Sequence, residues 1–220
     1  MTGRIIETLD DVMEGAAHLA AREPRFAAAL ELTGAPPLRR REDGFATLFS
    51  AIVSQQVSTA SATAIWNRVA ALGATEPAAY LAADDAALRA AGLSRQKIAY
   101  GRGLAGSGLD FAGLRALPDA EVVETLVRLK GVGRWTAEIY AMFSLGRADM
   151  FAPGDLALQD AARQLFALDA RPSERRLREM SLAWSPWRSV AARLLWAYYR
   201  IANRREGALS LCLSKLGARP

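Results

Sequence analysis

The sequence predicts an all-α protein, and three observations lead to that prediction. Hydrophobic residues recur at steps of three and four, the spacing that places them on one face of a helix. Clusters of Gly and Pro separate these runs, so that helices of ordinary length alternate with short loops. We find no fixed-period repeat and no segment with the apolar–polar alternation of a half-buried strand.

The expected helices follow from the periodic runs, taken in chain order. These runs are Phe45, Leu48, Phe49, Ile52, Val53 and Val57; Val122, Val123, Leu126, Val127 and Leu129; Ile139, Met142 and Phe143; the segment 156–166; and Leu194, Leu195, Tyr198 and Tyr199. A break at 35–37 and a second change near 146–153 divide the chain into residues 1–42, 43–148 and 149–220. The glycine-rich stretch 101–108 lacks the Gly-Lys-Ser/Thr ending of a P-loop and is predicted to be an ordinary loop.

Length, composition and charge restrict the class of protein. A chain of 220 residues that is 51% hydrophobic can bury a substantial core, as one large domain or two small ones. The formal charge is +5, and the positive charge is nearly all arginine, since the only lysines are Lys97, Lys130 and Lys215. Such a charge is typical of a protein that binds nucleic acid, and also of basic soluble proteins that do not.

Cysteine and histidine are too few for several kinds of site. Cys212 is the only cysteine, which excludes an intrachain disulfide, a cysteine zinc site and a four-cysteine iron–sulfur cluster. His18 is the only histidine and is expected to be a surface or packing residue. The acidic N-terminus does not resemble a signal peptide, and no apolar run reaches membrane-spanning length, so we expect a soluble intracellular protein.

The segment 129–137 predicts a tight turn that opens a helix. Gly131 and Gly133 permit positive φ angles and close backbone approach, and a helix ending near Leu129 precedes them. The first N–H groups of the helix that begins at Arg134 have no helical partner and can bind an anion such as a phosphate, beside the positive charge of Lys130. The alternative is an ordinary corner between two helices.

Asp155 follows Pro153-Gly154 and precedes the helical run 156–166. Asp is a preferred helix N-cap, and from this feature alone a capping role and a catalytic role both remain open. The two roles are compatible, because a carboxylate at a helix N-terminus is stabilised as the anion that faces a developing positive charge.

Aromatic and polar side chains supply further candidates. Trp184 and Trp187 are expected to pack in the core, whereas Trp135 would lie beside whatever the turn binds. The segment 54–58 places polar side chains on an otherwise apolar helix, and these either cap neighbouring elements or approach DNA.

Four segments, in this order, resemble the helix-hairpin-helix DNA glycosylases, and within them the alkylation-repair branch of DNA-3-methyladenine glycosylase II. They are Ile52-Val53-Ser54-Gln55-Gln56-Val57-Ser58, Gly131-Val132-Gly133-Arg134-Trp135-Thr136-Ala137, Phe151-Ala152-Pro153-Gly154-Asp155 and Trp184-Ser185-Pro186-Trp187-Arg188-Ser189. The resemblance implies two helical subdomains with an active cleft between them. Residues 43–148 would form a helical barrel with the helix-hairpin-helix at about 119–146, and residues 1–42 would pack with the C-terminal segment.

The resemblance also implies roles for individual residues. Asp155 takes the catalytic position, and Gln56 takes the position that fills the gap left by a flipped nucleotide. The base pocket would be lined by Trp135, Ile139, Tyr140 and Trp196, where Ile139 replaces a family tyrosine. DNA contacts would come from Gln55, Gln56, Ser58, Lys130, Gly131, Val132, Gly133, Arg134 and Thr136. Main-chain carbonyls at Val127, Leu129 and Val132 would hold a structural Na⁺ or K⁺.

The expected activity is that of a monofunctional glycosylase that excises alkylated bases, of the 3-methyladenine and 7-methylguanine type, by hydrolysis. Because Trp135 stands where lyase-type relatives carry a Schiff-base lysine, the abasic strand should stay intact. The expectation includes double-stranded DNA with damaged bases as partner, no required cofactor, a monomeric state, and a cytoplasmic, nucleoid-associated or nuclear location. Two alternatives are a glycosylase for oxidised, deaminated or mismatched bases, and a non-catalytic DNA-binding module.

Overall fold

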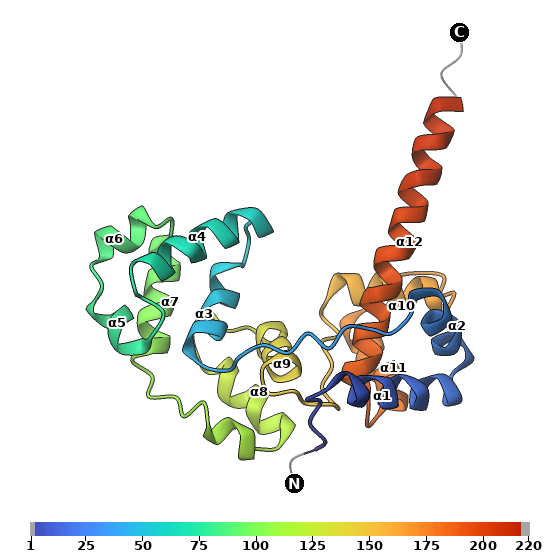
Figure 1. Cartoon of the computed structure of the whole chain (residues 1–220), viewed down its shortest axis with the longest axis horizontal. Coiled ribbons are helices and arrows are strands. Elements are labelled where there is room, and N and C mark those ends of the chain that lie inside the picture. The colour runs from blue at the N-terminus through green and yellow to red at the C-terminus, as the bar shows by residue number, and fades with distance from the viewer. Residues whose placement is uncertain (1–2, 217–220) are drawn as a thin grey trace. The chain divides into compact units, whose positions relative to one another are not determined.

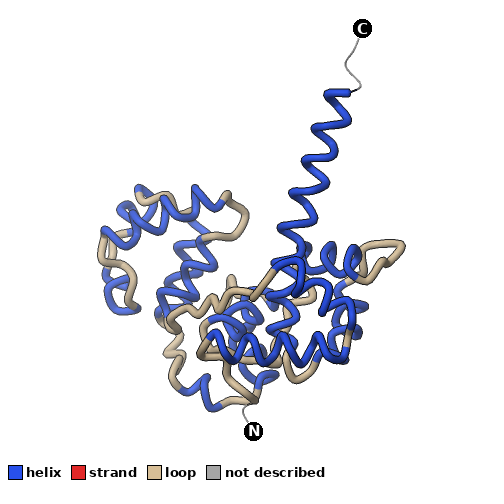
Figure 2. Tube along the Cα trace, turned by 45° about the vertical axis from the view of Figure 1, so that its right-hand side comes forward, coloured by secondary structure: helices blue, strands red, loops and turns tan. Residues whose placement is uncertain are grey.

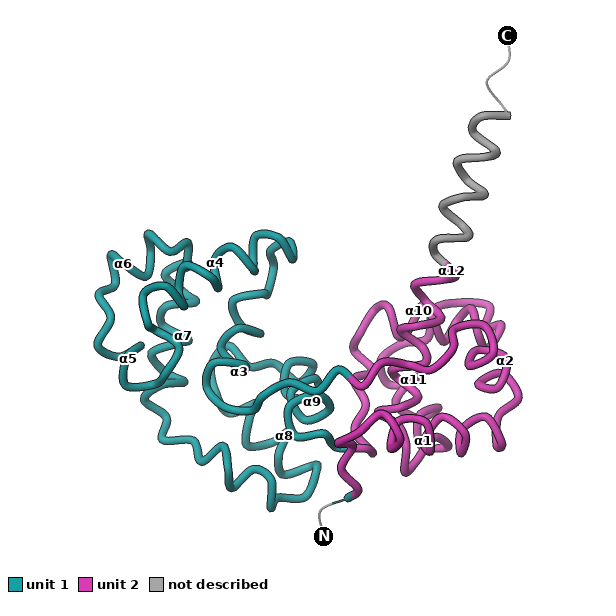
Figure 3. The backbone as a smooth tube through the Cα atoms, in the orientation of Figure 1, with its two compact units in different colours: residues 1–3, 39–147 teal, residues 4–38, 148–220 magenta. Residues whose placement is uncertain are grey.

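The computed structural model describes the backbone of residues 3–216 and the side chains of residues 3–202, so Cys212 and Lys215 lie outside the described side chains. The described residues contain helices and no β-strand, which confirms the predicted all-α class (Figure 2). Two compact units divide the chain: residues 1–3 with 39–147, and residues 4–38 with 148–220 (Figure 3). The sequence-based boundaries at 42/43 and 148/149 lie within four residues of these divisions. No helix of the described part is long and apolar enough to cross a membrane.

Unit 1, residues 39–147 with 1–3, contains seven of the described α-helices (Figure 1). They are α3 (Phe45–Val53), α4 (Thr59–Ala71), α5 (Pro77–Ala82), α6 (Asp85–Ala90), α7 (Arg95–Ala105), α8 (Asp119–Val127) and α9 (Arg134–Phe143), with a 3₁₀ helix at Gly113–Ala116. The buried apolar faces of α3, α8 and α9 supply much of its core, as their periodicity predicted.

Unit 2, residues 4–38 with 148–220, joins the first helices to the last ones. Its helices are α1 (Leu9–Arg22), α2 (Pro24–Thr33), α10 (Leu156–Leu165), α11 (Glu174–Ser181) and α12 (Arg188–Leu216), with a 3₁₀ helix at Leu182–Trp184. Trp184 and Trp187 are both 4% exposed, which confirms their predicted place in the core. The ring of Trp184 packs against Phe26, Phe151 and Phe166, and so joins segments from both ends of the chain.

Two local predictions were wrong. Helix α3 ends at Val53, so the segment 54–58 is a turn between α3 and α4 and not a helix. The stretch 101–108 is not all loop, because α7 continues to Ala105. A Cβ atom on Gly101 would lie 2.5 Å from the Tyr80 ring, so this glycine allows two helices to pack closely.

Candidate active site and DNA-binding hairpin

The turn between α8 and α9 forms the predicted hairpin. The N–H of Val132 donates to the carbonyl of Leu129 at 3.0 Å, and the Val132 side chain is buried in unit 1. Lys130, Gly133 and Arg134 are exposed around it. The α9 N-terminus has no side-chain cap. The first N–H groups of a helix have no partner within the helix, which favours an anion there, and Lys130 and Arg134 add positive charge, while Arg134 also lies 3.8 Å from the Glu138 carboxylate.

The two glycines of the hairpin serve different purposes. Gly131 has φ +92°, and a Cβ atom there would lie 2.5 Å from the Tyr100 ring, so both conformation and space require glycine. Gly133 has φ −81°, which contradicts the expectation of a positive φ, because it is the extended N-cap residue of α9. A Cβ atom on Gly133 would meet nothing within 4 Å. The space around it therefore does not require glycine at 133, although Gly is itself a favoured N-cap residue.

Gln55 connects the 54–58 turn to the hairpin within unit 1. Its Nε2 donates to the Gly131 carbonyl at 3.0 Å and lies 3.4 Å from Oγ1 of Thr136. The Thr136 side chain is buried, so only its main chain is placed to contribute at the N-terminus of α9. Gln56 is exposed, and its φ of +58° is uncommon for a residue other than glycine. Ser58 caps α4 by accepting the N–H of Ser61, which matches the capping alternative for this segment.

The aromatic candidates of unit 1 differ in exposure. Trp135 is 43% exposed beside the hairpin groove, which is lined by residues 127–133 together with Gln55 and Tyr100. Tyr140 is buried, and its hydroxyl accepts the N–H of Gly44 at 2.7 Å. Burial raises the pKa of Tyr140 to about 12, so the neutral phenol is kept in the core. Ile139 is half-buried on the same helix.

Asp155 lies at the N-terminus of α10 in unit 2. Its Oδ1 accepts the N–H of Leu158 at 3.0 Å and the indole N–H of Trp196 at 3.2 Å. The turn before it is fixed by Gln159, whose buried side chain donates to the Pro153 carbonyl at 2.8 Å. The carboxylate therefore has a fixed position, and both donors stabilise its negative charge. Sequence reasoning identified both residues but did not foresee the contact between Asp155 and Trp196.

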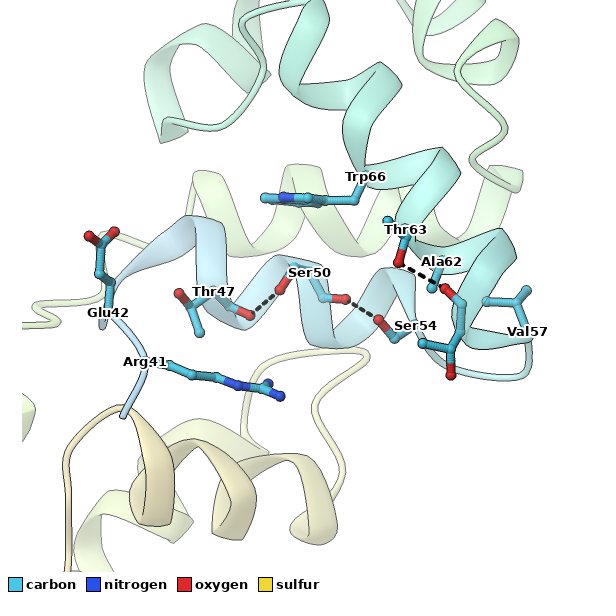
Figure 4. A pocket seen from close by; sticks show the side chains of 10 residues that line it. Arg41, Glu42, Thr47, Ser50, Ser54, Val57, Ala62, Thr63 and Trp66 are labelled. Carbon is cyan, nitrogen blue, oxygen red and sulfur yellow. Dashed lines mark hydrogen bonds between the residues drawn. The ribbon is translucent and has the colours of Figure 1, made fainter. Parts of the chain in front are cut away.

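A second groove of unit 1, of about 520 Å³, was missed by the sequence analysis. Its wall includes Trp66 of α4, the hydroxyl side chains of Thr47 and Ser50 on α3, and that of Ser54 directly after α3 (Figure 4). Ser50 and Ser54 donate to main-chain carbonyls of their own helix, so their oxygens remain acceptors for a ligand N–H. The three- and four-residue spacing of these hydroxyls on an apolar helix was the signal that could have found it.

Comparisons with known proteins place this geometry in a family. Residues 49–187 match the model of the HhH-GPD superfamily base excision DNA repair proteins. The DNA-3-methyladenine glycosylase 1 of Schizosaccharomyces pombe is 27% identical over 211 residues, covering 90% of this chain and 92% of that protein.

Solved structures of relatives agree with that match. A DNA-3-methyladenine glycosidase from Bacillus halodurans is 34% identical, with a TM-score of 0.78 over 90% of this chain and 93% of that one. The S. pombe 3-methyladenine DNA glycosylase Mag1, solved with abasic DNA, is 29% identical, with a TM-score of 0.72 over 83% and 95% of the two chains. The chain therefore belongs to the HhH-GPD superfamily of base excision DNA repair proteins.

Proposed function

We propose that this protein is a monofunctional DNA glycosylase that releases alkylated bases and leaves an intact abasic strand. The observation that carries the proposal is the carboxylate of Asp155, fixed by the α10 N-terminus and by the indole of Trp196. A DNA-binding module that only grips phosphates needs no such carboxylate. The names of the relatives, which are 3-methyladenine glycosylases, support alkylated bases as the substrate class.

In the proposed binding step, the hairpin of unit 1 grips duplex DNA through its phosphates. The N–H groups at the start of α9 and the side chains of Lys130 and Arg134 neutralise phosphate charge, and Gly133 lets the backbone approach closely. These contacts carry no sequence information, so damaged and undamaged duplexes bind alike through them. Gln56, exposed on its strained turn, fills the gap left by the extruded nucleotide.

In the proposed chemical step, the flipped base leaves and water replaces it. An alkylated purine such as 3-methyladenine is cationic, so it is a good leaving group and is favoured by aromatic faces such as those of Trp135 and Trp196. Asp155 stabilises the positive charge that develops on the sugar and orients the attacking water. The step needs no organic cofactor. The hydrogen bond from Trp196 supports a role as an orienting group for Asp155, in addition to its proposed place in the pocket wall. Tyr140 is buried and its hydroxyl accepts the Gly44 N–H, so we assign it no chemical role.

A monovalent cation at the hairpin is part of the proposal. Val127, Leu129 and Val132, whose carbonyls would be the ligands, are among the residues that line the hairpin groove. The Leu129 carbonyl accepts the Val132 N–H, but a carbonyl oxygen has a second lone pair, so this residue still fits as a ligand. A bound Na⁺ or K⁺ would supply a fixed positive charge near the phosphate and no chemistry.

One assay tests the proposed function. The protein is incubated with methylated, undamaged, uracil-containing and oxidised duplex DNA, and free base is measured for each. Release from methylated DNA alone is the expected result. Release confined to uracil or oxidised DNA would assign another lesion class, and binding without release from any substrate would leave only a DNA-binding module.

The fate of the strand is tested in parallel. Borohydride should trap no covalent adduct, because Trp135 stands at the position where lyase-type relatives carry the amine that forms the Schiff base. Efficient trapping that is abolished by replacing a lysine would overturn the assignment as a monofunctional enzyme.

A further inference from the structure

The ammonium group of Lys97 on α7 holds the turn that follows α3. Its Nζ donates to the Val53 carbonyl at 2.7 Å and to the Gln55 carbonyl at 2.8 Å. The side chain is half-buried, and this burial lowers the pKa of Lys97 from its ordinary value. The carbonyls at the end of a helix lack helical partners, so the lysine satisfies one acceptor that α3 leaves open, at Val53, and one of the following turn, at Gln55.

One of these two carbonyls directly precedes Gln56 in the chain. The Gln55 carbonyl belongs to the peptide unit that leads into Gln56, and the plane of that unit is the reference for the φ angle of +58°. A non-glycine residue in this region is strained, and the strain persists only where surrounding contacts fix it. Lys97 supplies such a contact and leaves the Gln56 side chain exposed.

The same helix also contacts the hairpin. Tyr100 lies three residues after Lys97, so the two side chains share a face of α7. The Tyr100 ring lies so close to Gly131 that a Cβ atom there would be 2.5 Å from it. Gln55 completes the connection by donating to the Gly131 carbonyl at 3.0 Å. Helix α7 therefore holds the Gln56 turn and the hairpin in a fixed register.

We propose that Lys97 is a positioning residue for nucleotide extrusion: it holds the 54–58 turn so that Gln56 enters the DNA stack in register with the phosphates bound at the hairpin. This inference rests on the proposed function. It assigns Lys97 no chemistry, because its ammonium is engaged by two main-chain carbonyls. Its effect should therefore depend on whether a base pair must be broken.

The test compares two duplexes that carry the same alkylated base. In one the base is paired, and in the other an abasic analogue replaces the opposite base, so that no pair has to be broken. Lys97→Met should slow single-turnover excision of the paired lesion about tenfold, the ratio that corresponds to about 1.4 kcal/mol. It should change excision of the unpaired lesion and affinity for undamaged duplex by less than about twofold. Arg95→Met, which removes an exposed cation of the same helix, is the matched control and should affect neither duplex.

A double-mutant cycle separates positioning from support of the fold. If Lys97 acts through Gln56, then Lys97→Met should add little to the defect of Gln56→Ala on the paired lesion. Equal losses on both duplexes, or a full tenfold further loss in the Gln56→Ala background, would overturn the proposal. An unchanged rate of Lys97→Met on the paired lesion would do the same. Failure of the proposed function would be recognised separately, because the unaltered protein would then release alkylated base from neither duplex.

Discussion

Replacement of Asp155 by Asn tests the central assignment with the smallest change in shape. The Asn side chain keeps an oxygen that can accept the Leu158 N–H at the α10 N-terminus and the Trp196 indole N–H. Asn and Asp are comparable as N-caps, so the free energy of unfolding should change by only a few tenths of a kcal/mol. The variant therefore removes one negative charge and little else.

The loss of rate expected on removal of this negative charge follows from the proposed chemistry. Two unit charges about 4 Å apart interact by about 4 kcal/mol near a protein surface, where the effective dielectric constant is about 20. Loss of this interaction in the transition state corresponds to a rate decrease of about a thousandfold. The assay is single-turnover release of 3-methyladenine from a defined duplex, with DNA affinity and the thermal midpoint of unfolding measured on the same samples.

A capping control makes the result decisive. Ser173 caps α11 of the same unit by accepting the Arg176 N–H at 3.2 Å. Ser173→Ala should lower the stability by about 1 kcal/mol and leave excision unchanged. Retention of near-native excision by Asp155→Asn would show that Asp155 is only a cap, and a parallel loss in Ser173→Ala would show that the assay reports stability.

Three further predictions concern contacts within unit 1 or within unit 2. Gly131→Ala should lower the unfolding midpoint because of its positive φ and the Tyr100 ring, whereas Gly133→Ala, which loses only a favoured N-cap residue, should lower it less and weaken binding of damaged and undamaged duplex alike. Trp196→Phe removes the indole N–H and keeps an aromatic ring, so excision should fall roughly tenfold, as for a hydrogen bond to a charged group worth about 1.5 kcal/mol, without loss of DNA affinity. Main-chain and side-chain hydrogen bonds from Thr8 and Glu7 lower the pKa of Asp11 below 3.8. The stability that the Asp11 carboxylate contributes should therefore be present above pH 3.8 and be lost as the pH falls further. Asp11→Asn should flatten the dependence of the free energy of unfolding on pH in this acidic range.

Much of this site could be predicted from sequence because its elements are local. The hairpin is defined by two glycines within three residues, and the helix that follows supplies its N–H groups by chain continuity. The place of Asp155 at a helix N-terminus follows likewise from Pro-Gly before it and a helical run after it. The conformations of Gly133 and of the 54–58 turn were missed, because an apolar run does not by itself mark where a helix ends.

The features of the site that the sequence did not predict depend on contacts between segments that are distant in the chain. Lys97 binds carbonyls 42 and 44 residues away, and the Trp196 indole reaches a carboxylate 41 residues away. Periodicity places a residue on a face of its own helix but does not say which main-chain atoms that face meets. The wrong prediction for 101–108 has this cause, since Gly101 lies within α7 where the Tyr80 ring leaves no room for a Cβ atom.

The capping and catalytic interpretations of Asp155 need not compete. An N–H donor at Oδ1 lowers the energy of the anion but also draws charge away from a cation facing it. A cap therefore assists catalysis only if it fixes the carboxylate without neutralising its charge. Leu158 and Trp196 both donate to Oδ1. We therefore expect Trp196→Phe to lower the excision rate, because the Asp155 carboxylate is then held less firmly in its orientation. Measured on the paired lesion at low temperature, the fold-loss in rate should exceed the fold-change in DNA affinity. An unchanged rate would show that the helix N-terminus alone orients Asp155.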